Sequence, residues 1–276
     1  MKHIEDKVVA ITGAGSGIGR ALALELARRG ARLSLSDVDE VGLAETVRLV
    51  GDVPEEPLVT AVDVASNDAV CAWAQQTWEH FGVVHGVINN AGVALSGTVE
   101  GVSVEDYTWI MGINLFGVIH GTKAFLPMLE ASGDGHVVNL SSVFGLAAQP
   151  LMSGYNASKF AVRGFTDALR QELALQKSNV SVTCVYPGGI RTNIARQARV
   201  DDSVQDFTGL DKERSTSRFE RAFRTTPAQA ARKIVEGMLA NRRSVLIGPD
   251  AYLIAGISMM FPTLYEKIIG RMFRSR

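Results

Sequence analysis

Short apolar runs alternate with segments of helical periodicity along the chain. The apolar run at residues 8–11 ends in a cluster of glycines, and residues 18–30 then place Ile18, Leu22 and Leu26 on one helical face. The same alternation repeats towards the C-terminus. The predicted strands are residues 8–11, 32–37, 58–64, 84–90, 136–141, 180–185 and 244–247. The predicted helices are residues 18–30, 38–50, 68–81, 104–129 and 155–176.

This order of elements predicts an α/β fold. Strands that alternate with helices at this spacing form βαβ units, which build a parallel sheet covered by helices on both faces. The strands are apolar on both sides, as expected for strands buried on both faces. We therefore expect a doubly wound, Rossmann-type parallel sheet of about seven strands in a three-layer α/β/α arrangement. We find no repeat or linker, which predicts a single domain over residues 1–276. The long helix is expected to bend near Gly112 and Gly117.

Two segments interrupt the alternation. Residues 193–226 are charged and irregular and follow the sixth predicted strand, so we expect a lid or substrate loop, with an unstructured surface excursion as the alternative. Residues 251–276 mix apolar clusters with basic side chains, which predicts an amphipathic helix. Such a helix could cover a substrate cleft, pack on a partner subunit or lie on a membrane surface. Packing within an oligomer is the favoured interpretation.

Composition and charge exclude several classes of protein. Lys and Arg total 28 against 29 Asp and Glu, for a net charge of −1, so a nucleic-acid partner is not expected. Cys71 and Cys184 are too far apart in sequence for a disulfide framework or a zinc site, and both are expected to be reduced, buried thiols. No metal is predicted. The charged N-terminus lacks a secretory apolar segment, and the apolar run 251–262 is shorter than the roughly 20 residues that span a bilayer. The cytoplasm is the expected location.

A glycine-rich turn joins the first predicted strand to the first predicted helix. Residues without a Cβ atom let the backbone approach a pyrophosphate, and the helix N-terminus offers free N–H groups to the anion. The spacing is T-G-x-x-x-G-x-G, which differs from the common G-x-G-x-x-G. The residues expected to hold a nucleotide here are Gly13, Ser16, Gly17, Ile18 and Gly19.

Asp37 ends the second predicted strand, 18 residues after Gly19. A carboxylate at this position accepts hydrogen bonds from the hydroxyls of an adenosine ribose and repels a 2′-phosphate. Neither Val38 nor Ser16 is basic, so the sequence favours NAD over NADP, which stays the alternative. The competing interpretations of Asp37 are a solvated carboxylate at the strand end and a cap for the helix that begins at Val38.

Tyr155 and Lys159 are four residues apart and share one face of a predicted helix. A neighbouring ammonium favours the phenolate and lowers a tyrosine pKa from its free value of about 10. The pair is therefore a plausible acid/base device for a carbonyl or alcohol, although such a pair is common on exposed helices. Ser141 and Ser142 close the strand before this helix.

The motifs together resemble the short-chain dehydrogenase/reductase family over about residues 8–192. The matching positions appear in the family's order and spacing, so a chance match is excluded in practice. They are Thr12-Gly13-x-x-x-Gly17-Ile18-Gly19, Asp37, Asp63, Asn89-Asn90-Ala91-Gly92, Asn114, Ser142, Tyr155-x-x-x-Lys159, Pro187-Gly188 and Thr192. One departure is His85, which stands where the family often has an Asp and is expected to be structural.

The resemblance assigns catalytic roles to four residues. It implies that Ser142 hydrogen-bonds the substrate oxygen and that Tyr155 transfers the proton. Lys159 would hold the nicotinamide ribose and depress the pKa of Tyr155. Asn114 would bend its helix and position a water on a proton relay to Lys159. Ser141 would be only a neighbour of the catalytic serine.

The resemblance also implies where the cofactor lies. Asn90 and Gly92 would shape its cleft, and Asp63 and Val64 would border the adenine. The residues expected to wrap the nicotinamide are Pro187, Gly188, Ile190 and Thr192. The family often forms homodimers or homotetramers through the two long helices, here residues 104–129 and 155–176.

The expected activity is hydride transfer between NAD(H) and a ketone or secondary alcohol. The substrate is expected to be hydrophobic, because the residues near it would be Val93, Ala94, Leu95, Phe144, Leu146, Leu151 and Met152. The alternatives are an NADP-dependent ketone reductase and a non-catalytic nucleotide-binding protein, and the latter predicts a degraded set of four catalytic residues. An epimerase or dehydratase is a further hypothesis, but such relatives carry a larger C-terminal substrate domain. The preference for NAD favours oxidation of the alcohol as the direction of the reaction.

Overall fold

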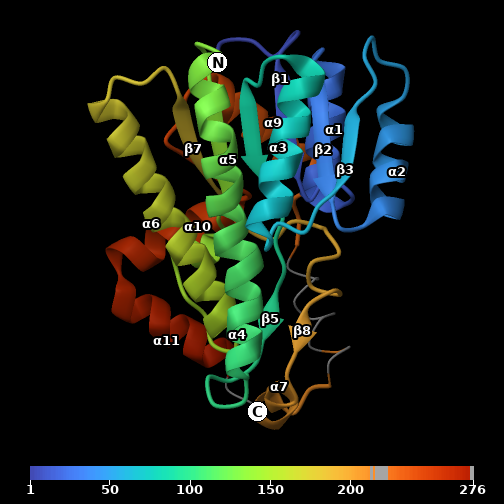
Figure 1. The fold of residues 1–276 in the computed structure, drawn as a ribbon. Helices are drawn as coiled ribbons and strands as arrows, with labels where there is room; N and C mark the ends of the chain where they lie inside the picture. The colour runs from blue at the N-terminus through green and yellow to red at the C-terminus, as the bar shows by residue number, and fades with distance from the viewer. Residues whose placement is uncertain (212–213, 215–222, 274–276) are drawn as a thin grey trace.

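A computed structural model describes residues 1–211, 214 and 223–273 of the chain. Its centre is a seven-stranded parallel sheet in the order β3-β2-β1-β4-β6-β7-β9 (Figure 1). The strands of this sheet are β1 (Val8–Thr12), β2 (Arg32–Asp37), β3 (Leu58–Ala61), β4 (Gly86–Asn89), β6 (His136–Leu140), β7 (Ser181–Pro187) and β9 (Ser244–Ile247). The sheet confirms the predicted doubly wound α/β class.

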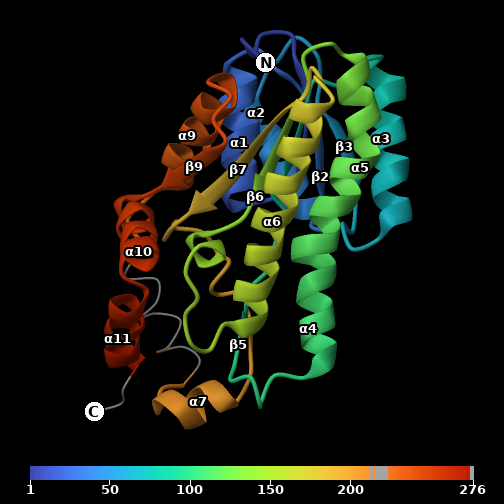
Figure 2. The ribbon, with the colours of Figure 1, turned by 90° about the vertical axis from the view of Figure 1, so that its left-hand side faces the viewer.

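Helices cover both faces of the sheet and make the three expected layers (Figure 2). One face carries α1 (Gly17–Arg28), α2 (Glu40–Val50) and α9 (Pro227–Leu239). The other face carries α3 (Asn67–Phe81), α5 (Gly117–Ala131) and α6 (Ser153–Leu175). The strand order reverses direction between β1 and β4, which places their carboxyl ends at the topological switch point where such folds bind ligands.

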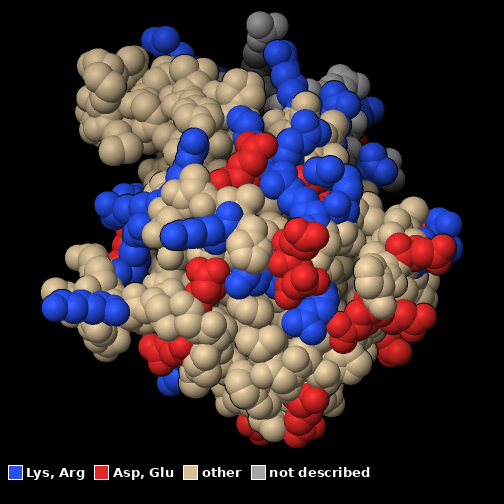
Figure 3. Space-filling view, turned by 90° about the horizontal axis from the view of Figure 1, so that it is seen from above, with Lys and Arg blue, Asp and Glu red and all other residues tan. Residues whose placement is uncertain are grey.

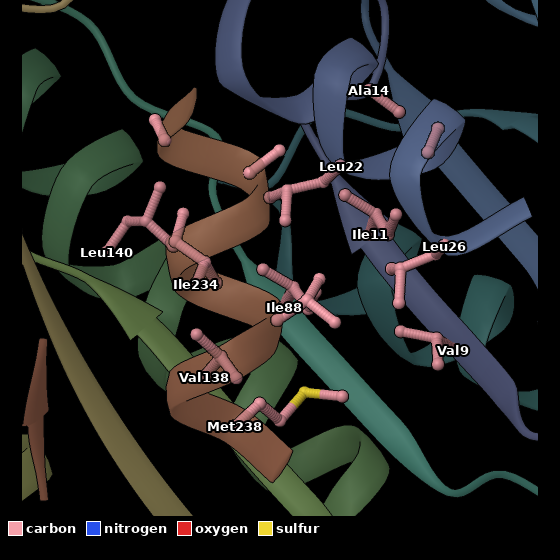
Figure 4. Packing of buried hydrophobic residues seen from close by; sticks show 14 of the residues in the cluster. Val9, Ile11, Ala14, Leu22, Leu26, Ile88, Val138, Leu140, Ile234 and Met238 are labelled. Carbon is pink, nitrogen blue, oxygen red and sulfur yellow. The ribbon is translucent and has the colours of Figure 1, made fainter. Parts of the chain in front are cut away.

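Two apolar cores hold the layers together. In the first, Leu22 and Leu26 of α1 and Ile234 of α9 pack over the strand residues Ile11 and Ile88 (Figure 4). In the second, Trp73 of α3 meets Phe125 of α5 edge to face, with ring centroids 4.9 Å apart. The amphipathic faces seen in the sequence are the faces that these cores bury, which explains why periodicity alone located the helices.

The long predicted helix at residues 104–129 is divided in the structure. It begins as α4 (Val104–Met111), widens into a π-helical turn, η1 (Gly112–Phe116), and continues as α5. The expected disturbance near Gly112 and Gly117 is thus confirmed. A π turn leaves i to i−4 backbone bonds unmade and is common at functional sites. Here it carries Asn114, which is completely buried.

Several predicted boundaries are corrected. The third strand ends at Ala61 instead of Val64, and the helix with Tyr155 begins at Ser153. Cys71 is exposed, so the prediction that both thiols are buried is wrong, because Cys71 lies on the solvent side of α3, while Cys184 is buried in β7.

The segment at residues 193–226 is more ordered than expected where it is described. It contains β8 (Arg199–Val200), which pairs in parallel with β5 (Leu95–Ser96), and the short helix α7 (Ser203–Thr208). This two-stranded sheet was not predicted, since two-residue strands carry no readable periodicity. Residues 212–213 and 215–222 of the expected loop lie outside the described residues.

The C-terminal segment forms two helices where one was expected. They are α10 (Pro249–Met260) and α11 (Pro262–Phe273), and they separate at Phe261, because a proline follows it. A short helix, η2 (Val143–Gly145), precedes α6. Within the described residues, no helix is long and apolar enough to cross a membrane.

His85 joins the strands at the amino end of the sheet. Its backbone N–H donates to Val8 O (2.9 Å), and its Nδ1 accepts from Val8 N (3.2 Å). Burial, and then the nearby Lys7, lowers the pKa of His85 to about 4. The imidazole is therefore neutral at physiological pH and acts as an acceptor. This fits the structural role expected from the sequence.

We predict that His85 makes the stability of the fold depend on pH. Because the folded pKa is depressed, the unfolded chain binds more protons between its own pKa of about 6.5 and the folded value near 4. Its contribution is complete above about pH 6.5 and declines as the pH falls through this window. His85→Asn keeps an acceptor but cannot titrate. Urea unfolding at about pH 7.5 and about pH 5 should show a smaller stability loss in the variant than in the wild type. Equal losses would contradict the assignment.

Candidate active site

The turn after β1 is tied to the turn after β4 by side-chain hydrogen bonds. Thr12 Oγ1 accepts from the backbone N–H groups of Asn90 (2.9 Å) and Ala91 (3.0 Å). Asn90 Nδ2 donates to the carbonyls of Thr12 (2.9 Å) and Gly13 (3.0 Å). Asn90, which was expected to shape the cofactor cleft, therefore acts by fixing the backbone of the glycine turn.

Glycines are required in this turn by contact and by backbone conformation. Gly13 has φ +66°, and a Cβ atom there would lie 2.8 Å from Ala91 Cα. A Cβ on Gly19 would collide with the Gly13 carbonyl. Gly17 has φ +52°, and its Cβ would come within 3.2 Å of Thr192 Cγ2, so Gly17 and Thr192 face each other. The turn thus brings together residues that are far apart in sequence.

The first turn of α1 points into the same region. Ser16 occupies the N-cap position with an extended backbone and makes no side-chain capping hydrogen bond. Amide groups at a helix N-terminus that no side chain caps are suited to an anion. Ile18 packs against the first apolar core and so anchors the helix beneath the turn. The residues present therefore fit the pyrophosphate of a dinucleotide.

Asp37 stands beside the glycine turn at the end of β2. Its Oδ2 accepts from Gly15 N (2.8 Å) and its Oδ1 from Asp39 N (3.1 Å). The side chain that caps α2 belongs to Asp39, which accepts from Gly42 N. The competing interpretation of Asp37 as the cap of this helix is therefore wrong. The Asp37 carboxylate is held at the switch-point edge of the sheet, as a ribose ligand requires.

Asp63 and Val64 follow β3 at the same edge. Val62 N donates to the Asp37 carbonyl (2.9 Å), which brings this segment beside β2. Asp63 is exposed and accepts from Ala65 N (2.9 Å), while Val64 is buried. Their positions are compatible with the predicted border of the adenine.

Four polar side chains converge at the carboxyl ends of β4 and β6. Tyr155 and Lys159 lie on the first turns of α6, and Ser142 follows β6, near enough to Tyr155 to lower its pKa. Lys159 Nζ donates to Leu140 O (3.0 Å) and lies 5.7 Å from the centroid of the Tyr155 ring. All three are buried.

Asn114 completes this group from the π turn. Its Oδ1 accepts from Val93 N (2.8 Å), and its Nδ2 donates to Val93 O (3.0 Å) and to Ser158 Oγ (3.1 Å). Gly92 leaves room for the side chains of Asn114 and Lys159. A Cβ atom on Gly92 would lie 3.2 Å from Asn114 Oδ1 and 3.4 Å from Lys159 Nζ. Asn114 therefore locks the segment after β4 onto α6.

Burial controls the protonation of Tyr155 and Lys159. It raises the pKa of the Tyr155 phenol, and the hydrogen bond with Ser142 offsets part of this rise. The expectation that Lys159 depresses the Tyr155 pKa stays a prediction, because the causes of this shift are burial and Ser142. Burial also lowers the pKa of Lys159 to about 8. Near neutrality the phenol thus carries its proton and the lysine is largely charged.

The segment after β7 forms the opposite wall. Pro187 ends β7, and Gly188 N donates to Ile247 O (2.9 Å). Ile190 is buried and forms a bridge with Thr225, and Thr192 N donates to Ile190 O (2.8 Å). The four residues expected to wrap a nicotinamide therefore lie along one ordered segment.

Asp250 supports this wall and was missed from the sequence. Its Oδ2 accepts from Gly189 N (2.6 Å), and a Cβ on Gly188 would collide with the same carboxylate. The only signal in the sequence is a carboxylate in the first turn of a helix after the last strand, which is too common to indicate a site.

An apolar cluster includes Tyr155 and lies beside the group of four polar residues. Ala94, Leu95 and Met152 are buried in it, with Val93 and Phe144 packed against it, while Leu146 and Leu151, which were also expected near the substrate, are not part of it. The β5–β8 sheet closes over this cluster. Arg199 fastens β8 to α4 by stacking on Trp109 (3.7 Å to the ring centroid) and pairing with Asp106 (2.8 Å).

Comparison with known proteins agrees with this geometry. A family model described as short chain dehydrogenase matches residues 7–203. The chain is 46% identical to SadH of Mycobacterium tuberculosis, which its name classes as an oxidoreductase, over 98% of this chain and 96% of that protein. It is 31% identical to dehydrogenase/reductase SDR family member 7B of Mus musculus, over 99% and 82% of the two chains.

A solved structure shares the whole fold. A short-chain dehydrogenase/reductase from Burkholderia phymatum, crystallised in complex with NAD, has a TM-score of 0.86 and 32% identity over 96% of each chain. Levodione reductase has a TM-score of 0.78 and 29% identity over 91% of this chain and 98% of its own.

We predict that Gly92→Ala damages the site while the fold persists. The added Cβ must displace Asn114 or Lys159, and misplacement of this size lowers turnover between roughly 10- and 100-fold. The measurement is NADH oxidation at 340 nm with a ketone panel, beside the thermal unfolding midpoint. Gly164→Ala is the matched control, since a Cβ there would meet nothing within 4 Å beyond its own helix. Unchanged turnover in Gly92→Ala would refute the described contact.

Proposed function

Because the chain belongs to the short-chain dehydrogenase/reductase family, we propose that it transfers a hydride between NAD(H) and a hydrophobic ketone or secondary alcohol. The observation that carries the proposal is the burial of the Ser142 and Tyr155 hydroxyl groups near each other at the edge of the apolar cluster, where Ser142 lowers the pKa of Tyr155. These two hydroxyl groups can bind one substrate oxygen while the apolar side chains surround the rest of the molecule.

The chain's own residues handle the proton and the orientation. NAD(H), when bound, supplies or accepts the hydride. Tyr155 carries its proton near neutrality, so it can donate to a carbonyl oxygen in reduction and accept from an alcohol in oxidation. Ser142 orients that oxygen, and Lys159 adds a positive charge beside the developing phenolate. We propose that Asn114 extends this chain through a water to Lys159.

The intact group of four residues argues against a non-catalytic protein. A nucleotide-binding module has no need to bury Tyr155 and Lys159 beside Ser142, because burial of ionisable groups costs free energy. An epimerase or dehydratase is less favoured, since β5, β8 and α7 form only a small cover over the substrate side.

The cofactor proposal rests on Asp37. The glycine turn and the unblocked start of α1 fit a pyrophosphate, and the Asp37 carboxylate stands where an adenosine ribose would extend from it. Its charge would oppose a 2′-phosphate, so NAD is proposed and NADP is the alternative. Arg20 does not reverse this, because it donates to Gly42 O (3.1 Å) and Thr46 Oγ1 (3.0 Å).

Assembly and location are part of the proposal. Phe116 and Phe160 are exposed by 49% and 40% at η1 and α6, which supports pairing of two subunits along α5 and α6 into a homodimer or homotetramer. The charged residues at positions 2 and 5–7 are in keeping with the cytoplasmic location that we propose.

We predict that Tyr155→Phe loses turnover and keeps nucleotide binding. Loss of a general acid or base lowers rates by roughly 10²- to 10⁴-fold. The measurement is ketone-dependent NADH oxidation, with NADH affinity followed by protein fluorescence. Tyr252→Phe removes a hydroxyl from an exposed tyrosine on α10 and should behave as the wild type. Wild-type turnover in Tyr155→Phe would reject the mechanism.

We predict that Asp37→Asn weakens the discrimination between NAD and NADP. The amide can still accept from Gly15 N but no longer repels a phosphate or offers a charged acceptor to the ribose. The ratio of kcat/KM for the two cofactors should fall about 10- to 100-fold, the value of one charged hydrogen bond. Asp39→Asn is the control, because Asp39 only caps α2. A wild-type preference for NADP would overturn the cofactor proposal.

A further inference from the structure

An exposed apolar surface covers the two C-terminal helices. Figure 2 shows α10 and α11 standing out from the sheet layers, and in Figure 3 a lobe almost free of charged atoms projects on the side where these helices lie. Its large apolar side chains are 39% to 73% exposed. They are Tyr252, Leu253, Met259, Met260, Phe261, Leu264 and Ile268. We call this surface the C-terminal lobe. A contiguous apolar surface of this kind marks an interaction site.

The helix α10 has no polar face that could be exposed to solvent. Ala251 and Ala255 pack inward, while Leu253, Met259 and Met260 point outward by their spacing. Its one charged residue, Asp250, is engaged with Gly189 N and does not serve the outer face. A helix that is apolar all round is normally buried, so the outer face of α10 requires a cover.

α11 adds positive charge to the same surface. Leu264 and Ile268 are exposed, and Lys267 and Arg271 lie on the same side of the helix by their spacing. Tyr265 is buried on the side that meets the protein. Apolar residues flanked by Lys and Arg are the composition of helices that lie in the interface of an anionic bilayer.

The charges favour a lipid surface over a second copy of the chain. From residue 251 to the end of the sequence, Glu266 is the only acidic residue, against Lys267, Arg271, Arg274 and Arg276. A symmetric contact between two such lobes would bring like charges together, which costs free energy. An anionic bilayer complements both the apolar and the basic residues.

The C-terminal lobe is joined directly to the candidate active site. Tyr265 OH donates to Ala148 O (2.7 Å), in the segment between Ser142 and Tyr155. That segment continues into Met152 of the apolar cluster. At the start of α10, Asp250 accepts a hydrogen bond from Gly189 N in the segment after β7, which we propose borders the nicotinamide. The two C-terminal helices therefore contact two of the segments that carry residues of the candidate active site.

We propose that α10 and α11 dock this protein on an anionic lipid bilayer, with the apolar face among the acyl chains and Lys267 and Arg271 at the headgroups. The docking itself is argued from the C-terminal lobe and does not depend on the proposed function. Its consequence for the substrate does rest on the proposed function. In that case the ketone or alcohol is dissolved in the bilayer and enters beside Tyr265 and Met152 without crossing water.

The test is co-sedimentation of the full chain with vesicles of phosphatidylcholine alone and of phosphatidylcholine with phosphatidylglycerol. We expect the wild type to bind the anionic vesicles more tightly, and salt to weaken the binding. Met260→Glu with Leu264→Glu should abolish binding. Lys267→Glu with Arg271→Glu should lower binding to anionic vesicles by about tenfold or more. Val104→Glu with Leu175→Glu is the matched control, because both residues are exposed and apolar outside the lobe.

Each contrary outcome has a definite meaning. Absence of wild-type binding to either vesicle, or equal binding by the lobe variants, overturns the proposal. If the lobe variants instead reduce the particle mass in light scattering, the lobe is an interface between copies and the proposal is also overturned. Tyr155→Phe should sediment as the wild type does, so a failure of docking is distinguished from a failure of the proposed chemistry.

Discussion

The hydrogen bonds between Thr12 and Asn90 are the constraint on which the site depends. They join the carboxyl ends of β1 and β4, where the strand order reverses and the backbone must open a crevice. Gly13 can pass within contact distance of Ala91 only because it lacks a Cβ. Once these two turns are fixed, the start of α1 and the segment after β4 face the same space.

Buried polar groups then set the chemistry. Lys159 stays in the interior because its ammonium group donates a hydrogen bond to Leu140 O, and the Lys159 carbonyl accepts one from Ser141 Oγ (2.7 Å). Desolvation raises the Tyr155 pKa and lowers that of Lys159, so the site stores a proton on the phenol and a charge beside it. Buried polar groups are costly unless they are paired, and Asn114, which the π turn brings into the interior, is paired with Val93 and Ser158.

The C-terminal segment couples the outer surface to this interior. Asp250 and Tyr265 use two hydrogen bonds to support opposite walls of the site, while the neighbouring residues leave an apolar surface outside. If this surface docks on a bilayer as proposed, the protein is suited to a substrate that prefers a bilayer to water. The fold of the family thus positions the proposed catalytic residues, and the C-terminal helices would place them beside a bilayer.

The sequence by itself determined the α/β class and the strand and helix order, because periodicity is a local property. Its short motifs, through the resemblance to the family, selected Asp37 as a cofactor residue and Ser142, Tyr155 and Lys159 as catalytic candidates. Tertiary structure decided what depends on contacts between distant segments. The direction of the Tyr155 pKa follows from burial, the role of Asp250 from its approach to Gly189, and the β5–β8 pairing from strands too short to show a pattern. The split of the C-terminal segment followed the local signal of Pro262, but the side of each helix left uncovered depended on how α10 and α11 pack against the body of the protein.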